Sequence, residues 1–160
     1  MIKDEIGIMT KTNHENVVKY IESYEDDRFL WIVMEALIPS LKLQDVYTAK
    51  LKEWDRRSPL FDESTVRWIM KSILAGLNHI HEMGVTHRDL NLENILLVDD
   101  DIKTLKIIDF GISINSREAH ETAKTIGNIG YLAPEIFCSE GNLDAYAPPV
   151  DVWAAGLICC

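Results

Sequence analysis

The sequence predicts an α+β fold, in which helices and short antiparallel strands occupy different stretches of the chain. The first observation is the long stretch 62–84, whose apolar residues recur at helical spacing. The second is that the stretches 17–34 and 94–108 each hold two short apolar runs joined by acidic residues, a pattern typical of strand pairs. One long helix and two strand pairs are the elements on which this fold class depends.

The N-terminal part is predicted to be a helix followed by two strands. Three apolar residues of the segment 2–12 lie at i, i+4 and i+7, so they share one face of a helix. The runs 17–21 and 29–34 are rich in β-branched, aromatic and other apolar residues, which favour strands. We expect the two strands to be joined by the acidic turn between them.

The middle of the chain is predicted to contain the longest helix and a small β-ribbon. Residues 37–59 have no clear period, and we expect a solvated helix or loop over the charged stretch 50–57, to which no function is assigned. Asp62 precedes the amphipathic stretch and Gly84 follows it, as expected for the two ends of a helix. The apolar runs 94–98 and 105–108, separated by three aspartates, predict the ribbon.

The C-terminal part is predicted to be a long loop and then a helix. Residues 113–130 have no sustained period. Pro148 and Pro149 suit the first turn of a helix that continues through an apolar run to Cys160. Because this helix is apolar on all sides, we expect it to be a core element whose packing partners come from later residues.

Composition excludes several classes of protein. The chain has 160 residues, with 16 Lys and Arg against 26 Asp and Glu, and its net charge of −10 argues against nucleic acid or an anionic membrane as a partner. No signal peptide and no apolar run long enough for a membrane span are present. Three cysteines cannot form an even disulfide framework, which favours an intracellular, cytoplasmic location. The terminal Cys159 and Cys160 could carry a lipid, but core cysteines are the preferred interpretation.

Three motifs in order carry the functional prediction. Residues 87–94 read His-Arg-Asp-Leu-Asn-Leu-Glu-Asn, residues 109–111 Asp-Phe-Gly and residues 133–135 Ala-Pro-Glu. With these motifs the sequence resembles the eukaryotic protein kinase domain, most closely the calcium/calmodulin-dependent serine/threonine group. The resemblance implies an incomplete two-lobe kinase fold, with residues 1–36 as a remnant of the N-lobe and residues 37–160 as part of the C-lobe.

The resemblance implies phosphoryl transfer from ATP to a serine or threonine of a protein substrate. That reaction requires a carboxylate that orients the attacking hydroxyl, a role that matches Asp89. It also requires oxygen ligands for Mg²⁺, and Asn94 and Asp109 match those positions. ATP and Mg²⁺ are therefore the expected cofactors.

The remaining site residues are assigned by their positions in the family pattern. Glu5 stands where the family has the glutamate that pairs with a catalytic lysine. The residues expected to contact the nucleotide are Met34, Glu35, Leu37, Asn91 and Leu96. Those expected to form the structural spine are Met9, Tyr20, His87, Phe110 and Asp151. Those expected to act in regulation by phosphorylation are Arg88, Thr122 and Thr125.

The sequence departs from the family pattern at several positions. No glycine-rich loop and no lysine-bearing strand precede Glu5. Asn91 stands where serine/threonine kinases have a lysine that contacts the γ-phosphate, and Asn128 stands where they have a threonine. We expect the two amides to hydrogen-bond to each other, although neither replaces the positive charge of an ammonium group.

Three hypotheses follow from matches and departures together. The first is a serine/threonine kinase of which this segment is an inactive part, with a calcium sensor outside the chain, since no calcium-binding loop occurs in it. The second is a pseudokinase or binding module without phosphotransfer. The third is a chain that does not fold stably alone, because its apolar surfaces would meet water.

His79 and His81, two residues apart on one predicted helix, point to different sides, which argues against a shared zinc site.

Overall fold

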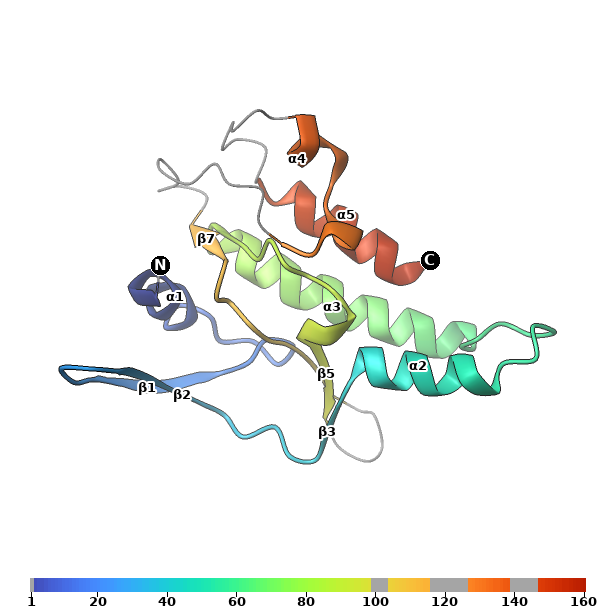
Figure 1. Ribbon diagram of the computed structural model, residues 1–160, viewed down its shortest axis with the longest axis horizontal. Coiled ribbons are helices and arrows are strands. Elements are labelled where there is room, and N and C mark those ends of the chain that lie inside the picture. The colour runs from blue at the N-terminus through green and yellow to red at the C-terminus, as the bar shows by residue number, and fades with distance from the viewer. Residues whose placement is uncertain (1, 99–103, 116–126, 139–146) are drawn as a thin grey trace.

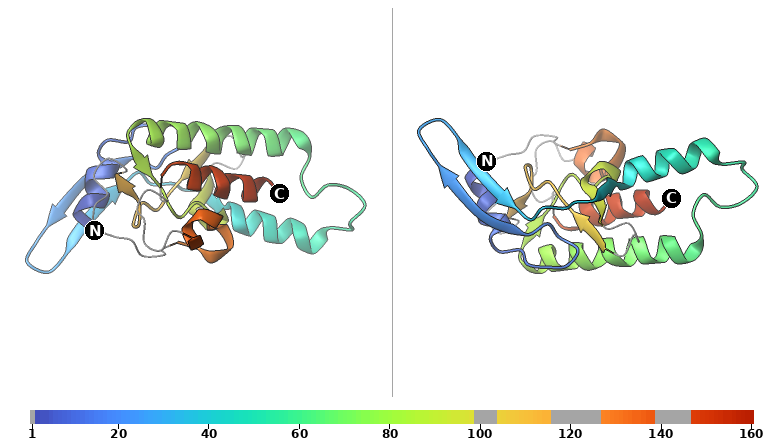
Figure 2. Two further views of the ribbon diagram at one scale, coloured as in Figure 1. Left: turned by 90° about the horizontal axis from the view of Figure 1, so that it is seen from above. Right: turned by 90° about the horizontal axis from the view of Figure 1, so that it is seen from below.

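The computed structural model describes residues 2–98, 104–115, 127–138 and 147–160, and its elements are arranged as two unequal parts (Figure 1). The smaller part holds α1 (Ile2–Met9) and the hairpin of β1 (Tyr20–Glu25) and β2 (Leu30–Met34). In the larger part, three helices run along one another, and α5 packs on α3 (Figure 1 and Figure 2). They are α2 (Leu43–Glu53), α3 (Glu63–Glu82) and α5 (Pro149–Cys159).

The remaining elements are short, and several of them carry the candidate site. In chain order they are β3 (Ser40–Lys42), β4 (Val85–Thr86), the 3₁₀ turn η1 (Leu92–Asn94), β5 (Ile95–Val98), β6 (Thr104–Ile107), β7 (Ile114–Asn115), the 3₁₀ turn η2 (Ile129–Tyr131) and α4 (Pro134–Cys138). None of the helices in the described ranges has both the length and the apolar character that crossing a bilayer requires.

The described strands form three antiparallel sheets, in the orders β1-β2, β3-β5-β6 and β4-β7. The predicted ribbon is confirmed, with Ile95 opposite Ile107 in its register. The predicted N-terminal strand pair is also confirmed, but its first strand begins at Tyr20. Val17, which was expected inside that strand, instead forms a single parallel bridge with Ile107 and joins the hairpin to β6.

The helix α3 forms one wall of the main core. Asp62 caps it, because its Oδ1 accepts the backbone N–H of Thr65 at 2.9 Å, and Gly84 ends it with a φ of 77°. Gly76 lies where a Cβ would come within 2.9 Å of the Cδ1 of Ile107. The buried residues of its inner face are Ile69, Ile73, Gly76, Leu77 and Ile80.

The structure adds detail to two predictions about helices. Residues 37–59 contain both β3 and the regular helix α2, which the sequence pattern hid because Leu43 is the single buried residue of α2. The predicted last helix is present as α5, and part of its apolar surface is not covered by the described residues. Val152 is 52% exposed and Trp153 45% exposed, because α5 packs on α3 with one face only. The predicted loop 113–130 includes β7 and η2, and its residues 116–126 lie outside the described ranges.

Candidate active site

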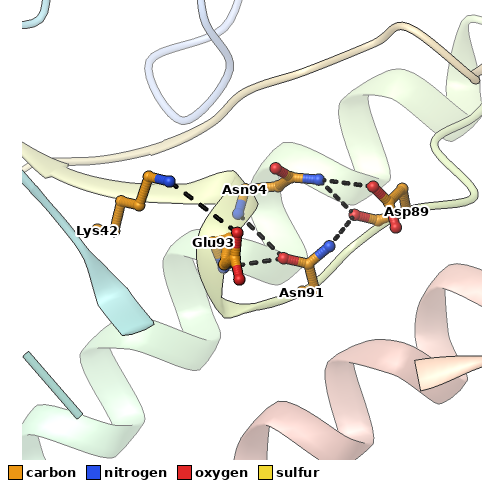
Figure 3. A network of polar contacts seen from close by, with 5 residues as sticks. All are labelled: Lys42, Asp89, Asn91, Glu93 and Asn94. Atoms are coloured by element: carbon orange, nitrogen blue, oxygen red, sulfur yellow. Dashed lines mark hydrogen bonds and ion pairs between the residues drawn. The ribbon is translucent and has the colours of Figure 1, made fainter. Parts of the chain in front are cut away.

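The carboxylate of Asp89 is held from two sides, and Figure 3 shows the side on which Asn94 lies. Its Oδ2 accepts the side-chain Nδ2 of Asn94 at 3.0 Å, and its Oδ1 accepts the backbone N–H of Asn128 at 3.0 Å. The Nδ2 of Asn94 also donates to the backbone carbonyl of Asp89 at 2.9 Å. Each carboxylate oxygen thus has a fixed position and still has a lone pair with which to accept another donor.

The side chain of Asn91 bonds to backbone groups of its own loop and caps η1. Its Oδ1 accepts the backbone N–H groups of Glu93 at 2.8 Å and Asn94 at 3.2 Å, while its Nδ2 donates to the carbonyl of Asp89 at 3.0 Å. Asn91 is 5% exposed. The predicted hydrogen bond between Asn91 and Asn128 is wrong for the described structure, because local turns use both amides. The Oδ1 of Asn128 accepts the N–H of Gly130 at 3.1 Å.

A weak ion pair lies at the edge of this network. The Nζ of Lys42, the last residue of β3, is 4.0 Å from the Oε2 of Glu93 in η1 (Figure 3). Both side chains are at least half exposed, so the pair contributes little to stability. It does place one positive and one negative charge on the open side of the loop that carries Asp89.

Asp151 anchors the backbone that precedes Asp89. Its buried carboxylate accepts the N–H of His87 at 2.8 Å and the N–H of Arg88 at 2.9 Å. The Nε2 of His81 lies 2.8 Å from the same carboxylate. Arg88 has a φ of 67°, which is uncommon for a residue with a Cβ, so these bonds hold a backbone conformation that the chain would otherwise avoid.

The predicted structural spine lies in one core. His87 is fully buried, and its ring contacts the edge of Phe110 with a centroid distance of 5.1 Å. Its Nδ1 accepts the N–H of Asp89 at 3.3 Å, so its Nε2 is the nitrogen that donates to the carbonyl of Ile108 at 3.0 Å. Met9 is buried in the same core and Tyr20 packs against it. His87 therefore orients the loop as a neutral imidazole.

Asp109 and Asn94 offer oxygen atoms of the kind that Mg²⁺ prefers. The N–H of Ile108 donates to the carbonyl of Asn94 at 3.0 Å, which holds the segment before Asp109 beside Asn94. The Oδ1 of Asp109 accepts the N–H of Gly111 at 3.1 Å, and the residue is exposed. Carboxylate and amide oxygens fit a hard cation. Within the described ranges, no three His, Cys, Asp or Glu side chains gather in a way that would suit another metal.

Glu35 is tied to β6 through a lysine that the sequence analysis missed. The Oε1 of Glu35 lies 2.7 Å from the Nζ of Lys106, and it also accepts the N–H of Lys19 at 2.7 Å. The Nζ of Lys106 donates to the carbonyl of Val17 at 3.3 Å as well. A lysine inside the apolar run 105–108 was the one signal available in the sequence. These contacts fix the side chain of Glu35, whereas its backbone leads into the segment predicted to meet adenine.

The other residues that the family pattern suggested lie at the following positions in the structure. Met34 ends β2, Leu37 is packed at the margin of the main core, and Leu96 lies in β5. The Nε of Arg88 donates to the carbonyl of Ile112 at 2.6 Å. The side chain of Glu5 and the residues Thr122 and Thr125 lie outside the described part of the structure.

Comparison with known proteins gives a consistent set of relatives. The protein kinase domain family matches residues 1–160. Serine/threonine-protein kinase cds1 of Schizosaccharomyces pombe is 37% identical over 164 residues, which cover 99% of this chain and 33% of that protein. The probable serine/threonine-protein kinase fhkC of Dictyostelium discoideum is 34% identical over 157 residues, which cover 98% of this chain and 25% of that protein.

A third relative is a kinase whose name includes its dependence on calcium and calmodulin. Calcium/calmodulin-dependent protein kinase cmkB of Emericella nidulans is 32% identical over 165 residues, which cover 99% of this chain and 37% of that protein. Across the three relatives, the matched region is thus between 25% and 37% of their own length.

Proposed function

Since this chain belongs to the protein kinase family, we propose that it supplies the catalytic loop of a serine/threonine kinase, which transfers the γ-phosphate of ATP to a protein hydroxyl. The observation that supports this most is the carboxylate of Asp89, which Asn94 and Asn128 hold by one oxygen each. A carboxylate fixed in this way is suited to receive and orient a hydroxyl group.

In the proposed reaction, Asp89 accepts a hydrogen bond from the substrate hydroxyl and takes its proton as the oxygen attacks phosphorus. The two N–H donors keep the carboxylate in one orientation, so no reorganisation is needed at the moment of transfer. Asp151 and His87 act as positioning residues, because they fix the backbone on which Asp89 stands.

Asn94 and Asp109 are the proposed ligands of Mg²⁺, which, when bound with ATP, supplies positive charge next to the phosphate oxygens. Met34, Leu37, Leu96 and the backbone of Glu35 are the proposed contacts of adenine. Asn91 was assigned to the nucleotide by resemblance, but its side chain caps η1. We therefore assign Asn91 to the shape of the loop.

A specific observation favours a second candidate function. An amide at position 91 carries no positive charge, and its hydrogen bonds are used within the loop. Loss of one charge-stabilising contact commonly slows an enzyme about a hundredfold or more. A pseudokinase or scaffold module that keeps the fold without phosphotransfer is the alternative.

The proposal is tested with a kinase that contains residues 1–160 together with the remaining kinase-fold elements, by phosphotransfer from radiolabelled ATP to peptides that contain serine or threonine, in the presence of Mg²⁺. We expect Asp89→Asn to abolish transfer, because the amide cannot take the proton. Asp45→Asn, a change to an exposed aspartate of α2, is the matched control and should have no effect. Transfer that survives Asp89→Asn would contradict the assignment. Binding of ATP without any transfer by the unmodified protein would favour the scaffold alternative.

Four further assignments stay predictions. The division into residues 1–36 and 37–160 follows the lobes of the family. Regulation through Arg88 and a phosphate on Thr122 or Thr125 is a proposal that mass spectrometry of the active protein can test. Because one relative is named calcium/calmodulin-dependent, we also propose a calcium sensor outside residues 1–160 and a cytoplasmic location.

A further inference from the structure

Two histidines join the connection between α1 and β1 to the helix α3. His14 lies in that connection and His79 lies in the last turns of α3, 65 positions later in the sequence. Their rings stack with centroids 5.1 Å apart and planes inclined by 25°. Both residues are half-buried, and neither belongs to the proposed active site.

Each ring accepts a hydrogen bond from the backbone of the connection. The Nε2 of His79 accepts the N–H of Asn13 at 3.2 Å, and the Nδ1 of His14 accepts the N–H of Asn16 at 3.0 Å. An imidazole nitrogen can accept only while it carries no proton. Each accepting ring is therefore neutral in this structure, with its single proton on the other nitrogen.

A second proton on either ring would remove one of these hydrogen bonds. If both rings were protonated, two positive charges would face each other across the stack, which is unfavourable in a partly buried position. The charged groups that face His14 come from three elements. Burial lowers the pKa of His14 below its ordinary value, His79 and Lys106 of β6 lower this pKa further, and the neighbouring Glu15 raises it.

The connection has a second, independent attachment that does not titrate in this range. The Nδ2 of Asn16 donates to the carbonyl of Leu105 at 2.9 Å, and the N–H of Ile107 donates to the carbonyl of Asn16 at 2.9 Å. These bonds hold the connection on β6. The connection is therefore held on β6 at any pH in this range, and the histidine pair determines whether it is also held on α3, close to the end of α1 at Met9.

We propose that His14 and His79 form a pH-sensitive latch, in which neutral His79 holds Asn13 on α3 and neutral His14 keeps the turn 14–16 closed beside it, and which opens when these stacked rings gain a second proton. This inference concerns a part of the molecule outside the active site and does not depend on the proposed function. The ligand in this proposal is the proton, so the latch is expected to open as the pH falls.

The first test measures amide hydrogen exchange of Asn13 and Asn16 by NMR between pH 8 and pH 5, expressed as protection factors. A ring whose pKa is lowered in the latched state makes that state less favourable as the pH falls below about 6.5, the ordinary pKa of histidine. We expect protection of both amides to fall by up to about tenfold per pH unit below that value, and then to level off below the pKa of the latched ring. Protection that stays constant over this range would overturn the proposal.

The second test uses a double variant that keeps the acceptors and removes the titration. Asparagine places an oxygen near the position of Nδ1 and glutamine places one near Nε2, so His14→Asn with His79→Gln preserves both hydrogen bonds. We expect the pH dependence of the two protection factors to disappear. His120→Gln, a histidine outside the described residues, controls for the loss of a histidine elsewhere. An unchanged pH dependence in the double variant would refute the latch. If that variant does not fold, the pH dependence of amide protection in the unmodified protein is the test.

Discussion

Replacing Glu35 with glutamine removes the negative charge from the most buried lysine–carboxylate pair in the described structure. The Nζ of Lys106 lies 2.7 Å from the Oε1 of Glu35, and the side chains are 12% and 27% exposed. Breaking a fully buried pair costs about 3–5 kcal/mol, whereas an exposed pair contributes about 0–1 kcal/mol. Because Lys106 keeps the carbonyl of Val17 and Glu35 is partly exposed, we expect Glu35→Gln to lower the free energy of unfolding by about 2 kcal/mol.

The assay is urea unfolding of a double-mutant cycle made of Glu35→Gln, Lys106→Met and both together. The double variant removes the uncompensated charge, so it should lose less stability than the sum of the two single changes, by about 1–2 kcal/mol. Glu63→Gln is the matched control, because Glu63 pairs with Arg67 on the exposed surface of α3 and should cost less than about 0.5 kcal/mol. Additive single changes, or equal effects of Glu35→Gln and Glu63→Gln, would refute the reasoning.

Three other predictions follow from single positions. Asp151→Asn should destabilise the fold by about 2–4 kcal/mol and abolish phosphotransfer, because an amide cannot accept all the donors that the carboxylate accepts; urea unfolding measures the first effect. Gly76→Ala should cost about 1–3 kcal/mol, because the new Cβ would crowd the backbone carbonyl of Asn16 as well as the side chain of Ile107, whereas Gly156→Ala, with open space around its Cβ, should not destabilise; equal thermal midpoints would contradict this. Hydrogen bonds lower the pKa of Asp62, and the largest effect comes from the hydroxyl of Ser64, followed by the side chain and the backbone N–H of Thr65. The Asp62 cap therefore stabilises α3 above about pH 4 and is lost as the pH falls further, so the unfolding midpoints of the unmodified protein and Asp62→Ala should converge in acid.

The sequence by itself determined the features that depend on near neighbours along the chain. Asp62 and Gly84 mark the ends of α3 to within a residue, because a cap bonds to groups within four positions of itself. The two predicted strand pairs were found for the same reason, since apolar runs on either side of a short turn meet each other. The order of the three motifs was sufficient to predict the kinase family.

Only the tertiary structure decided which of these residues meet. Asp151 contacts the backbone of His87 across 64 positions, and Glu35 meets Lys106 across 71. No periodicity or spacing records such pairs, because they depend on how α5 packs under the catalytic loop and how β6 lies beside the end of the hairpin. Asn91 shows the converse: resemblance assigned it to the nucleotide, whereas its short side-chain amide accepts the nearby backbone N–H groups of Glu93 and Asn94. Long-range packing therefore decided the electrostatic contacts of the site, while local hydrogen bonding decided the orientation of its side chains.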